Sequence, residues 1–439
     1  MEAEQTSVTG WVEKIQTFKS HAFIHLRYGV GSLYHVQVVV TGTLPAELVQ
    51  ETYVTIKGTK KQLPQKAHSY QPYEIHIAVS AIVIHSRSDP DFAARCPSDA
   101  SDEVHLQERH LYLRDPKFAV ITKLRALLLK ALRTHFESTQ CLEIVPPCFV
   151  GNQCEGGATL FKLKHPGRTG AEPQDCYLTQ SSQFYLEYAL PGVGDCYCIY
   201  PSFRAEKSHT RRHLTEFLHA EAEWSGIFKF ADHLQKLEAL LYGTLSRFYS
   251  YVQAEKLEQY FNLKTRLPQL LVMAKDIKVM THKEAIQYCR DHMIYKDPER
   301  QVHFDPLDDI PEAAERQMID DIGKIVFLTH FPTHTKSFYM KPDEQDPTYA
   351  LGCDVEVPGV GEIIGSGVRV SDLAQLKKRL KDEGLKEEDY REYLELRKYG
   401  HGCTSGMGLG MDRMLTWILA THTIRDVVTY PRYPGHLTP

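Results

Sequence analysis

The chain has 439 residues, a formal net charge of -5, 42% hydrophobic residues and 24% charged residues. This length allows two or three domains with real cores, and the composition is ordinary for a globular protein. The net charge excludes an overall basic nucleic-acid binder, but it leaves room for local basic surfaces that meet phosphates. The sequence shows no signal or transit peptide and no apolar run of about 18 residues, so we expect a cytoplasmic protein without a membrane span.

The elements follow in chain order. Residues 8–86 alternate β-branched and aromatic residues with polar ones, which predicts a small all-β barrel or sandwich. Residues 86–104 carry two prolines and no periodicity, which is typical of an irregular linker. From residue 117, "KFAVITKLRALLLKALRTHFEST" places leucines at helical spacing and predicts a long helix that opens a mixed domain. Residues 371–397 are charged and predict two surface helices broken at Gly384.

Residues 203–217, "FRAEKSHTRRHLTEF", concentrate basic and acidic side chains in an otherwise acidic chain. The flanking residues alternate between apolar and polar, so we expect two strands joined by a basic loop at 207–213. Three acids and one arginine on one face are costly to cover unless a ligand or cations balance them. We therefore interpret this face as a ligand site rather than as a solvated hairpin face; its residues are Arg204, Glu206, Glu221 and Glu223.

Two later stretches carry related signals. In "DVEVPGVGEIIGSGVR", Asp354 and Glu362 flank a glycine-rich turn and Arg369 follows. This pattern suits a hard cation beside phosphate, although an ordinary turn with surface acids has the same composition. In "GMGLGMDRMLTWILA", glycines lead into a helix whose first turn carries Arg413. An arginine there gains nothing from the helix dipole, which indicates that it meets an anion.

Together these stretches resemble the three signature motifs of class II aminoacyl-tRNA synthetases, in order and spacing. "HFESTQCLEIVPPCF" is similar to motif 1, the hairpin around Arg204 to motif 2, and the "GLGMDR" helix to motif 3. The N-terminal β-unit resembles the anticodon-binding OB-fold of the aspartyl, asparaginyl and lysyl enzymes (subclass IIb). "EGGATLFKL", "TQSSQFYLE", "DIPEAAER" and "KSFYM" are most similar to the eukaryotic-type cytosolic asparaginyl branch.

The resemblance implies an α+β fold with an OB-fold barrel at 1–86, a hinge at 87–116 and a catalytic domain at 117–439, where helices flank an antiparallel sheet. It implies that ATP activates asparagine to an adenylate, which is then transferred to the 3′ end of tRNA(Asn). It also implies a homodimer formed through motif 1.

The resemblance further implies roles for single residues. Arg204 would hold the α-phosphate, Glu206 the adenine amino group, and Phe217 and Arg413 would stack on the two sides of the ring. Arg204 and Arg413 are the implied catalytic pair. The implied ATP-binding residues are Arg204, Glu206, Arg212, His213, Phe217, Glu362, Gly410 and Arg413. The implied ligands of a Mg²⁺ ion on the phosphates are Glu362, Asp354 and Glu223.

The implied amino-acid-binding residues are Glu155, Gln183, Arg204, Glu221 and Arg369. Glu221 would accept from the side-chain amide NH₂ and Arg369 would donate to the amide oxygen. A carboxylate at this place repels aspartate and favours an amide. Aspartyl enzymes usually carry a lysine in the stretch similar to "QSSQFYLE", where this chain has Leu186, which we expect on a strand. The cationic partner for aspartate is therefore missing.

The chain departs from the family in two regions. In the β-unit the resemblance implies anticodon contacts by Phe23 and Arg27, but Tyr28 replaces the family's acid. Tyr34 occupies the position of its glutamine and could still stack on a base. In the second domain, "CTSGMGLG" replaces "PHGGYGLG", and "GEIIGSGVR" replaces "GEIVGGSMR", which moves the serine by one position. We expect these changes to tune affinity or rate.

Three hypotheses remain open. The first is an active ligase, with an aspartyl enzyme as its close rival. The second is a paralogue that kept adenylate chemistry and lost tRNA charging, such as an ammonia-dependent asparagine-making enzyme; the β-unit disfavours it. The third is a non-catalytic RNA-binding protein of synthetase ancestry, which is disfavoured by the intact Arg204, Glu206, Phe217, Glu362 and Arg413.

Overall fold

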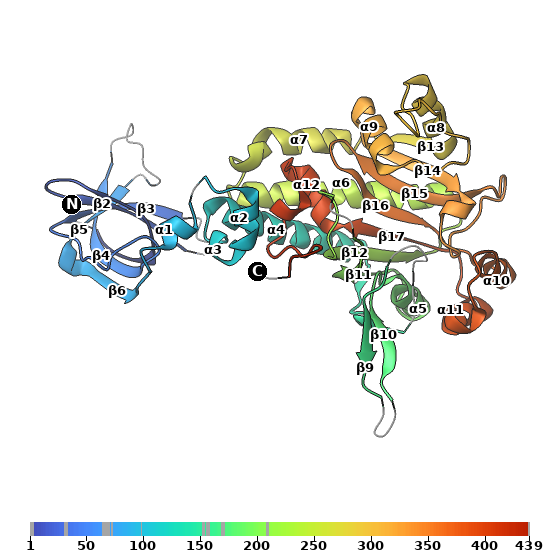
Figure 1. The fold of residues 1–439 in the computed structure, drawn as a ribbon, viewed down its shortest axis with the longest axis horizontal. Coiled ribbons are helices and arrows are strands. Elements are labelled where there is room, and N and C mark those ends of the chain that lie inside the picture. The colour runs from blue at the N-terminus through green and yellow to red at the C-terminus, as the bar shows by residue number, and fades with distance from the viewer. Residues whose placement is uncertain are drawn as a thin grey trace. The chain divides into compact units, whose positions relative to one another are not determined.

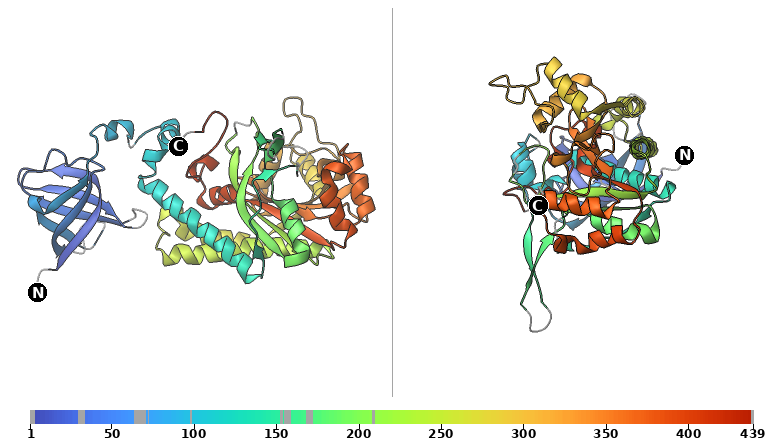
Figure 2. Two further views of the ribbon diagram at one scale, coloured as in Figure 1. Left: turned by 90° about the horizontal axis from the view of Figure 1, so that it is seen from below. Right: turned by 90° about the vertical axis from the view of Figure 1, so that its right-hand side faces the viewer.

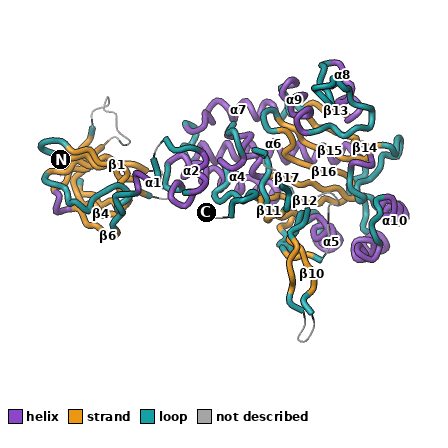
Figure 3. The backbone as a smooth tube through the Cα atoms, viewed as in Figure 1, coloured by secondary structure: helices purple, strands orange, loops and turns teal. Residues whose placement is uncertain are grey.

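The computed structural model describes residues 4–29, 34–63, 71, 73–97, 99–151, 154, 159–167, 172–207 and 210–437. The chain forms two compact units, Met1–Leu124 and Arg125–Leu437. Strands dominate the first unit, whereas the second combines strands with many helices (Figure 3).

The first unit contains a closed five-stranded barrel (Figure 1). Its strand β1 pairs with both β2 and β4, which closes the ring in the order β1-β2-β3-β5-β4 and leaves β6 beside β4. Alternate residues of each strand fill the interior, as Ile24 and Leu26 do on β2. The all-β prediction and the OB-like barrel are confirmed. The strands are β1 (Gln5–Thr17), β2 (Ala22–Tyr28), β3 (Tyr34–Thr41), β4 (Tyr53–Gln62), β5 (Tyr73–Ala78) and β6 (Ile82–Ser86).

The segment after the barrel is not the irregular linker that we expected. It contains three short helices, α1 (Phe92–Arg95), α2 (Asp102–Gln107) and α3 (Arg109–Tyr112). The side chain of Ser101 caps α2 by accepting from the backbone N–H of Val104. Helices of four to six residues are too short to show an apolar period, so the pattern could not reveal them. The boundaries at residues 86 and 116 stay predictions.

The second unit is built on an eight-stranded sheet in the order β13-β14-β15-β16-β17-β12-β11-β7. Neighbours from β14 to β11 are antiparallel, while the edge strands β13 and β7 pair in parallel. The predicted hairpin is confirmed as β11 and β12. The strands are β7 (Leu142–Glu143), β11 (Cys196–Phe203), β12 (Glu216–Ser225), β13 (Lys278–Thr281), β14 (Val326–Pro332), β15 (Tyr349–Val357), β16 (Gly361–Val368) and β17 (Thr404–Gly410). A smaller sheet pairs β8 (Phe149–Val150), β10 (Gln174–Leu178) and β9 (Lys162–His165).

Two long helices, α4 (Pro116–Ser138) and α6 (Phe230–Ala254), run side by side, and the hydroxyl of Tyr251 donates to Thr134 between them at 3.2 Å (Figure 2). Helix α4 confirms the helix expected from residue 117. The two predicted surface helices are also confirmed, and the break between them contains Gly384 with a φ of 69°. The other helices are α5 (Gln183–Val193), α7 (Leu263–Met273), α8 (His282–Asp291), α9 (Glu312–Ile322), α10 (Leu373–Asp382), α11 (Arg391–Lys398) and α12 (Met411–Leu419). Among the described residues, every helix is too short or too polar to cross a bilayer.

The two faces of the sheet differ in chemistry. On β12, the fully buried Ala220 and Ala222 and the buried Trp224 lie on the face that packs against helices such as α12. The alternate residues His219, Glu221 and Glu223 lie on the opposite face. This second face carries the functional side chains described next.

Candidate active site

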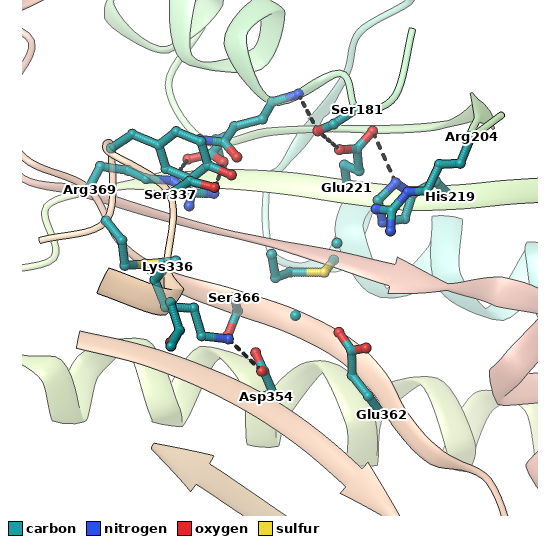
Figure 4. A pocket seen from close by; sticks show the side chains of 18 of the residues that line it. Ser181, Arg204, His219, Glu221, Lys336, Ser337, Asp354, Glu362, Ser366 and Arg369 are labelled. Atoms are coloured by element: carbon teal, nitrogen blue, oxygen red, sulfur yellow. Dashed lines mark hydrogen bonds and ion pairs between the residues drawn. The ribbon is translucent and has the colours of Figure 1, made fainter. Parts of the chain in front are cut away.

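A cavity of about 400 Å³ lies on the polar face of the large sheet (Figure 4). Strands β12, β15, β16 and β17, the start of α5 and the segment after β14 each contribute to its wall. The cavity brings together residues that are more than 200 positions apart in the chain. Its charged and amide-bearing lining residues are Gln183, Arg204, Glu206, Glu221, Glu223, Lys336, Asp354, Glu362 and Arg369.

A second cavity, of about 80 Å³, adjoins the first and shares Arg204, Glu206 and Glu362 with it. It adds the remaining residues for which we predicted ATP contacts, namely Arg212, His213, Phe217, Gly410 and Arg413. The tertiary fold therefore places the hairpin arginine and the arginine at the start of α12 in one continuous site. This arrangement was the main geometric requirement of the sequence interpretation.

The second cavity combines a flat aromatic ring with several cations. The guanidinium of Arg204 lies 5.5 Å from the ring centroid of Phe217. Arg413 donates to the backbone carbonyl and to the carboxylate of Glu362, both at 3.0 Å. Burial lowers the pKa of His213, and the nearby Arg413 lowers it further, so this imidazole is neutral at pH 7. A ring with guanidinium groups beside it suits a purine with attached phosphates.

The far end of the first cavity holds a buried ion pair. Arg369 donates two hydrogen bonds to the carboxylate of Glu223, and both side chains are at most 5% exposed. Glu221 lies beside this pair, where it accepts from the hydroxyl of Ser181 and, at 2.8 Å, from the backbone N–H of Ser182. This end thus offers both an acceptor and a donor to a small polar group. An amide needs both, whereas a carboxylate would face the charge of Glu221.

The three predicted magnesium ligands do not lie together. Asp354 and Glu362 both lie beside Gly365, and Lys336 donates to Asp354 at 2.7 Å. Glu223 is instead held by Arg369 beside Gly406. In the part of the chain that the structure describes, no three carboxylate, histidine or cysteine side chains come close enough to hold a metal. Glu223 thus lies apart from the other two acids, and metal binding by Asp354 and Glu362 stays a prediction.

Lys336 and Glu187 are site residues that the sequence interpretation missed. Lys336 lies in "KSFYM", in the wall of the first cavity, with its ammonium 3.6 Å from the ring centroid of Phe331. Glu187 is fully buried and accepts from Gln183 at 2.9 Å and from Arg397 at 2.6 Å. Arg397 and its neighbours hold the pKa of Glu187 below its usual range, although burial opposes them. A lysine inside an aromatic-rich stretch was the available signal for Lys336.

Leu186 does not lie on a strand or in the cavity wall. It belongs to helix α5 and packs with Leu190, Cys196 and Cys198 in a fully buried cluster. The helix begins at Gln183 with the polar residues of "QSSQ" before it, so the apolar period that follows was too short to separate helix from strand. Leu186 therefore acts on the site only through the packing of α5. Glu155, predicted to hold the α-amino group, lies outside the described residues.

The barrel residues predicted to contact an anticodon separate into three environments. Phe23 lies on the outer face, opposite Val39. Arg27 is buried at 3% exposure and pairs with Glu51 at 2.7 Å, so its guanidinium is not offered to a ligand. Tyr34 on β3 lies opposite Tyr28 on β2, and the ring of Tyr28 packs on the barrel core. Because side chains alternate along a strand, Tyr34 faces the inner side of the sheet, whereas Phe23 faces the outer side.

Gln37 lies on the face of the barrel that carries Phe23, and its amide donates to Glu74 at 3.1 Å. Gln37 lies opposite His25, and His25 is two residues from Phe23 on the same face of β2. Phe18 and His21 add rings at 5.6 Å and 5.0 Å from that of Phe23. The alternation in "YHVQVVV" places Gln37 on the face opposite to that of Val36 and Val38. The anticodon contacts of Phe23, Arg27 and Tyr34 stay a prediction.

Comparisons with known proteins agree with this geometry. The family model for class II tRNA synthetases (D, K and N) matches residues 101–434. The cytoplasmic asparagine–tRNA ligase of Saccharomyces cerevisiae is 36% identical over 99% of this chain and 77% of its own length, and that of Homo sapiens is 34% identical over the same shares. The Entamoeba histolytica asparaginyl-tRNA synthetase, solved with asparaginyl-adenylate, has a TM-score of 0.88 and 32% identity, covering 100% of this chain and 97% of its own.

Proposed function

Because the chain belongs to the class II tRNA synthetases of the D, K and N group, we propose that it is an asparagine–tRNA ligase. It activates asparagine with ATP to asparaginyl-adenylate and transfers the asparaginyl group to tRNA. The observation that carries the proposal is the continuous site, in which Arg204 and Arg413 line one end and the Arg369–Glu223 pair with Glu221 lines the other. The relatives are named cytoplasmic enzymes, and we assign this chain to the same compartment.

In the first step, the α-carboxylate of asparagine attacks the α-phosphorus of ATP in line with the departing pyrophosphate. No general base is required, because the carboxylate is ionised at neutral pH. Arg204 neutralises charge on the α-phosphate, and Arg413 meets the phosphate tail while Phe217 supports adenine. Holding both reactants in this geometry supplies most of the rate enhancement.

Magnesium fits the donor set beside the phosphates. Asp354 and Glu362 offer hard carboxylate oxygens, and Mg²⁺ in nucleotide sites commonly takes one or two carboxylates together with phosphates and water. Burial raises the pKa of Asp354 to about 6, while Lys336 opposes the rise, so this carboxylate is ionised at pH 7. The ion would neutralise charge on the phosphates.

Asparagine selectivity follows from the charge at the far end. Arg369 donates to the side-chain oxygen of asparagine, and Glu221 accepts from its NH₂ group. Aspartate would place a carboxylate against Glu221, which costs free energy through like-charge repulsion. Gln183, which Glu187 holds in place, takes part in binding the α-amino group.

Amino-acid-dependent pyrophosphate exchange with the purified protein tests this assignment. We expect exchange that requires Mg²⁺ and asparagine, followed by charging of tRNA(Asn). Equal or greater exchange with aspartate would overturn it. Formation of free asparagine from aspartate, ATP and ammonia would instead support the asparagine-making paralogue, and tRNA binding without exchange would support a non-catalytic protein.

We also propose a homodimer formed through the segment similar to motif 1. That segment exposes Leu142 on the edge strand β7 of the large sheet, Val145 in the loop after it and Phe149 on β8 of the smaller sheet. Exposed apolar side chains gathered in one segment favour association with another chain. Sedimentation should show a dimer that Val145→Glu converts to a monomer, whereas Val272→Glu on α7, another highly exposed valine, should leave it intact. A monomeric native protein would contradict the proposal.

A further inference from the structure

A fully buried histidine lies behind the polar face of the sheet and has no part in the proposed chemistry. His233 belongs to helix α6 and is 0% exposed. Its Nδ1 lies 2.9 Å from the hydroxyl of Ser405 on β17, and its Nε2 lies 2.9 Å from the hydroxyl of Ser366 on β16. One imidazole therefore joins a helix to two neighbouring strands.

The donors and acceptors in this chain can be assigned. The hydroxyl of Ser366 donates its one proton to the carbonyl of Cys353 on β15, so it must accept from His233 Nε2–H. The Nδ1 atom then accepts from the hydroxyl of Ser405. Burial lowers the pKa of His233 to about 3, so the ring is neutral, as this arrangement requires. The imidazole of His233 is therefore linked by hydrogen bonds to β16 and β17 directly, and to β15 through Ser366.

This chain of hydrogen bonds lies on the other face of the sheet from the end of the cavity that holds Arg369 and Glu223. Ser405 pairs across the sheet with Trp224 and Val368, the neighbours of Glu223 and Arg369. Between these two charged residues lies Gly406, where a Cβ atom would overlap both the carboxylate and the guanidinium. A small change in the spacing of β16 and β17 would therefore move Arg369 relative to Glu223.

The two serines belong to two separate glycine-rich stretches, Ser405 to "CTSGMGLG" and Ser366 to "GEIIGSGVR". In the fold, their hydroxyls bond to the two nitrogens of the same ring. One side chain therefore joins the two glycine-rich strands.

We propose that the Ser405–His233–Ser366 hydrogen-bond chain is a brace that sets the spacing of β16 and β17 beneath Arg369 and Glu223. His233 is thereby a positioning residue for recognition of the asparagine side chain. The inference rests on the proposed function, since it needs Arg369 to read the amide. Gly410, at the ATP end of β17, is five residues, or about 17 Å, further along the strand than Ser405, so we expect the KM for ATP to change less than the KM for asparagine.

The first test is His233→Leu, assayed by pyrophosphate exchange. Loss of the brace leaves two hydroxyls without their partner and allows the strands to shift. We expect the KM for asparagine to rise about fivefold to tenfold, with the KM for ATP unchanged within about twofold. Unchanged KM for asparagine, or equal rises in both constants, would refute the brace.

A second variant distinguishes the effect of His233 on the position of Arg369 and Glu223 from its effect on the stability of the folded protein. His233→Leu combined with Ser366→Ala and Ser405→Ala removes every polar group of the brace together, so the stability lost in the single variant should largely return. We expect the melting temperature to recover while the KM for asparagine stays raised. A native KM in this triple variant would overturn the proposal, and the triple variant decides the matter if the single one does not fold.

The matched control is His135→Leu, which removes another buried histidine that packs against Gly243 of the same helix α6. It should lower stability without changing either KM. The wild-type enzyme separates the two proposals: absence of asparagine-dependent exchange there would refute the proposed function, whereas the brace is refuted only when wild type is active and the variants keep a native KM.

Discussion

Acidic residues of the same type serve different purposes in this site, and their neighbours decide which. Glu223 is paired with Arg369, Glu362 with Arg413, and Glu187 with Arg397. Among the described residues, the contacts of Glu221 are two neutral donors, the hydroxyl of Ser181 and the backbone N–H of Ser182, and His219 at 3.6 Å. A carboxylate whose charge is not cancelled by a guanidinium still repels another carboxylate. Glu221 is therefore the acid best placed to exclude aspartate.

Arg204 is the first residue to test. Because it lines both cavities and lies over Phe217, its removal should withdraw charge stabilisation at the α-phosphate. We expect Arg204→Ala to lower kcat/KM in pyrophosphate exchange by about 100-fold to 1,000-fold while the circular dichroism spectrum stays native. Arg300→Ala, at an exposed position, is the control and should be silent. Unfolding of Arg204→Ala would indicate a structural role instead.

Glu221 carries the second prediction. Glu221→Gln keeps the shape of the side chain and removes its charge, so the penalty against aspartate should fall. We expect the ratio of kcat/KM for asparagine over aspartate to decrease about tenfold or more. Glu216→Gln lies on the same strand at an exposed position and should preserve the ratio. An unchanged ratio in Glu221→Gln would assign discrimination to another group.

At the scale of elements, strand β17 serves the site because its glycines have no side chains. Gly406 and Gly408 leave room for Glu223, Arg369 and His219, because a Cβ at either glycine would overlap these side chains. The strand thus permits a close approach that a β-branched residue would prevent. Its continuation into α12 then presents Arg413 to the neighbouring cavity.

Gly406→Ala tests this role. The new methyl group would push the Arg369–Glu223 pair apart, and we expect the KM for asparagine to rise at least tenfold, equivalent to about 1.4 kcal/mol. Gly192→Ala on α5 has open space around its Cβ and should have no effect on KM. A native KM for Gly406→Ala would mean that the pair adapts without cost.

Helix α6 gives the enzyme an acid-sensitive component. The pKa of His233 is about 3 in the folded protein and about 6.5 when unfolded, so the unfolded state binds more protons between these values. Stability is therefore lost as pH falls below 6.5. Urea titrations should show the free energy of unfolding falling by about 2 kcal/mol from this group between pH 7 and pH 5. The triple variant without the brace should show a correspondingly flatter pH dependence; an identical slope would exclude His233 as a contributor.

On the scale of the whole molecule, the two units divide the recognition of substrates. The second unit holds the two cavities that we propose for ATP and asparagine, whereas the barrel carries the aromatic cluster of Phe18, His21 and Phe23 on its outer face. Aromatic rings on an OB-type barrel suit the stacking of single-stranded bases. If the barrel binds RNA as we propose, its recognition of RNA is separable from adenylate chemistry.

Phe23→Ala should expose this division. Loss of one stacked base is worth about 1–3 kcal/mol, so we expect the KM for tRNA to rise about fivefold or more. Pyrophosphate exchange, which needs no tRNA, should keep its native rate. Tyr34→Ala, on the other side of its strand, should leave both unchanged. A higher KM for tRNA in Tyr34→Ala alone would place the base-binding face on that side.

The sequence by itself determined the β-unit, the long helix α4, the β11–β12 hairpin and the residue types around the nucleotide. These features depend on local periodicity and on short motifs, which can be recognised from residues that lie close together in the sequence. The sequence did not predict correctly the secondary structure at Leu186, and it did not determine the facing of the Tyr34 side chain. Near each position, too few residues follow a regular apolar period. A shift of one residue in a strand reverses the side on which a side chain lies.

Only the tertiary structure decided which charges are paired. That Glu223 pairs with Arg369, and that Lys336 pairs with Asp354, depends on strands β12, β14, β15 and β16 meeting in one sheet. The same is true of His233, whose two serine partners lie 133 and 172 residues away. Contacts across such separations leave no local pattern, because they exist only once the strands have paired and the helix has packed against them.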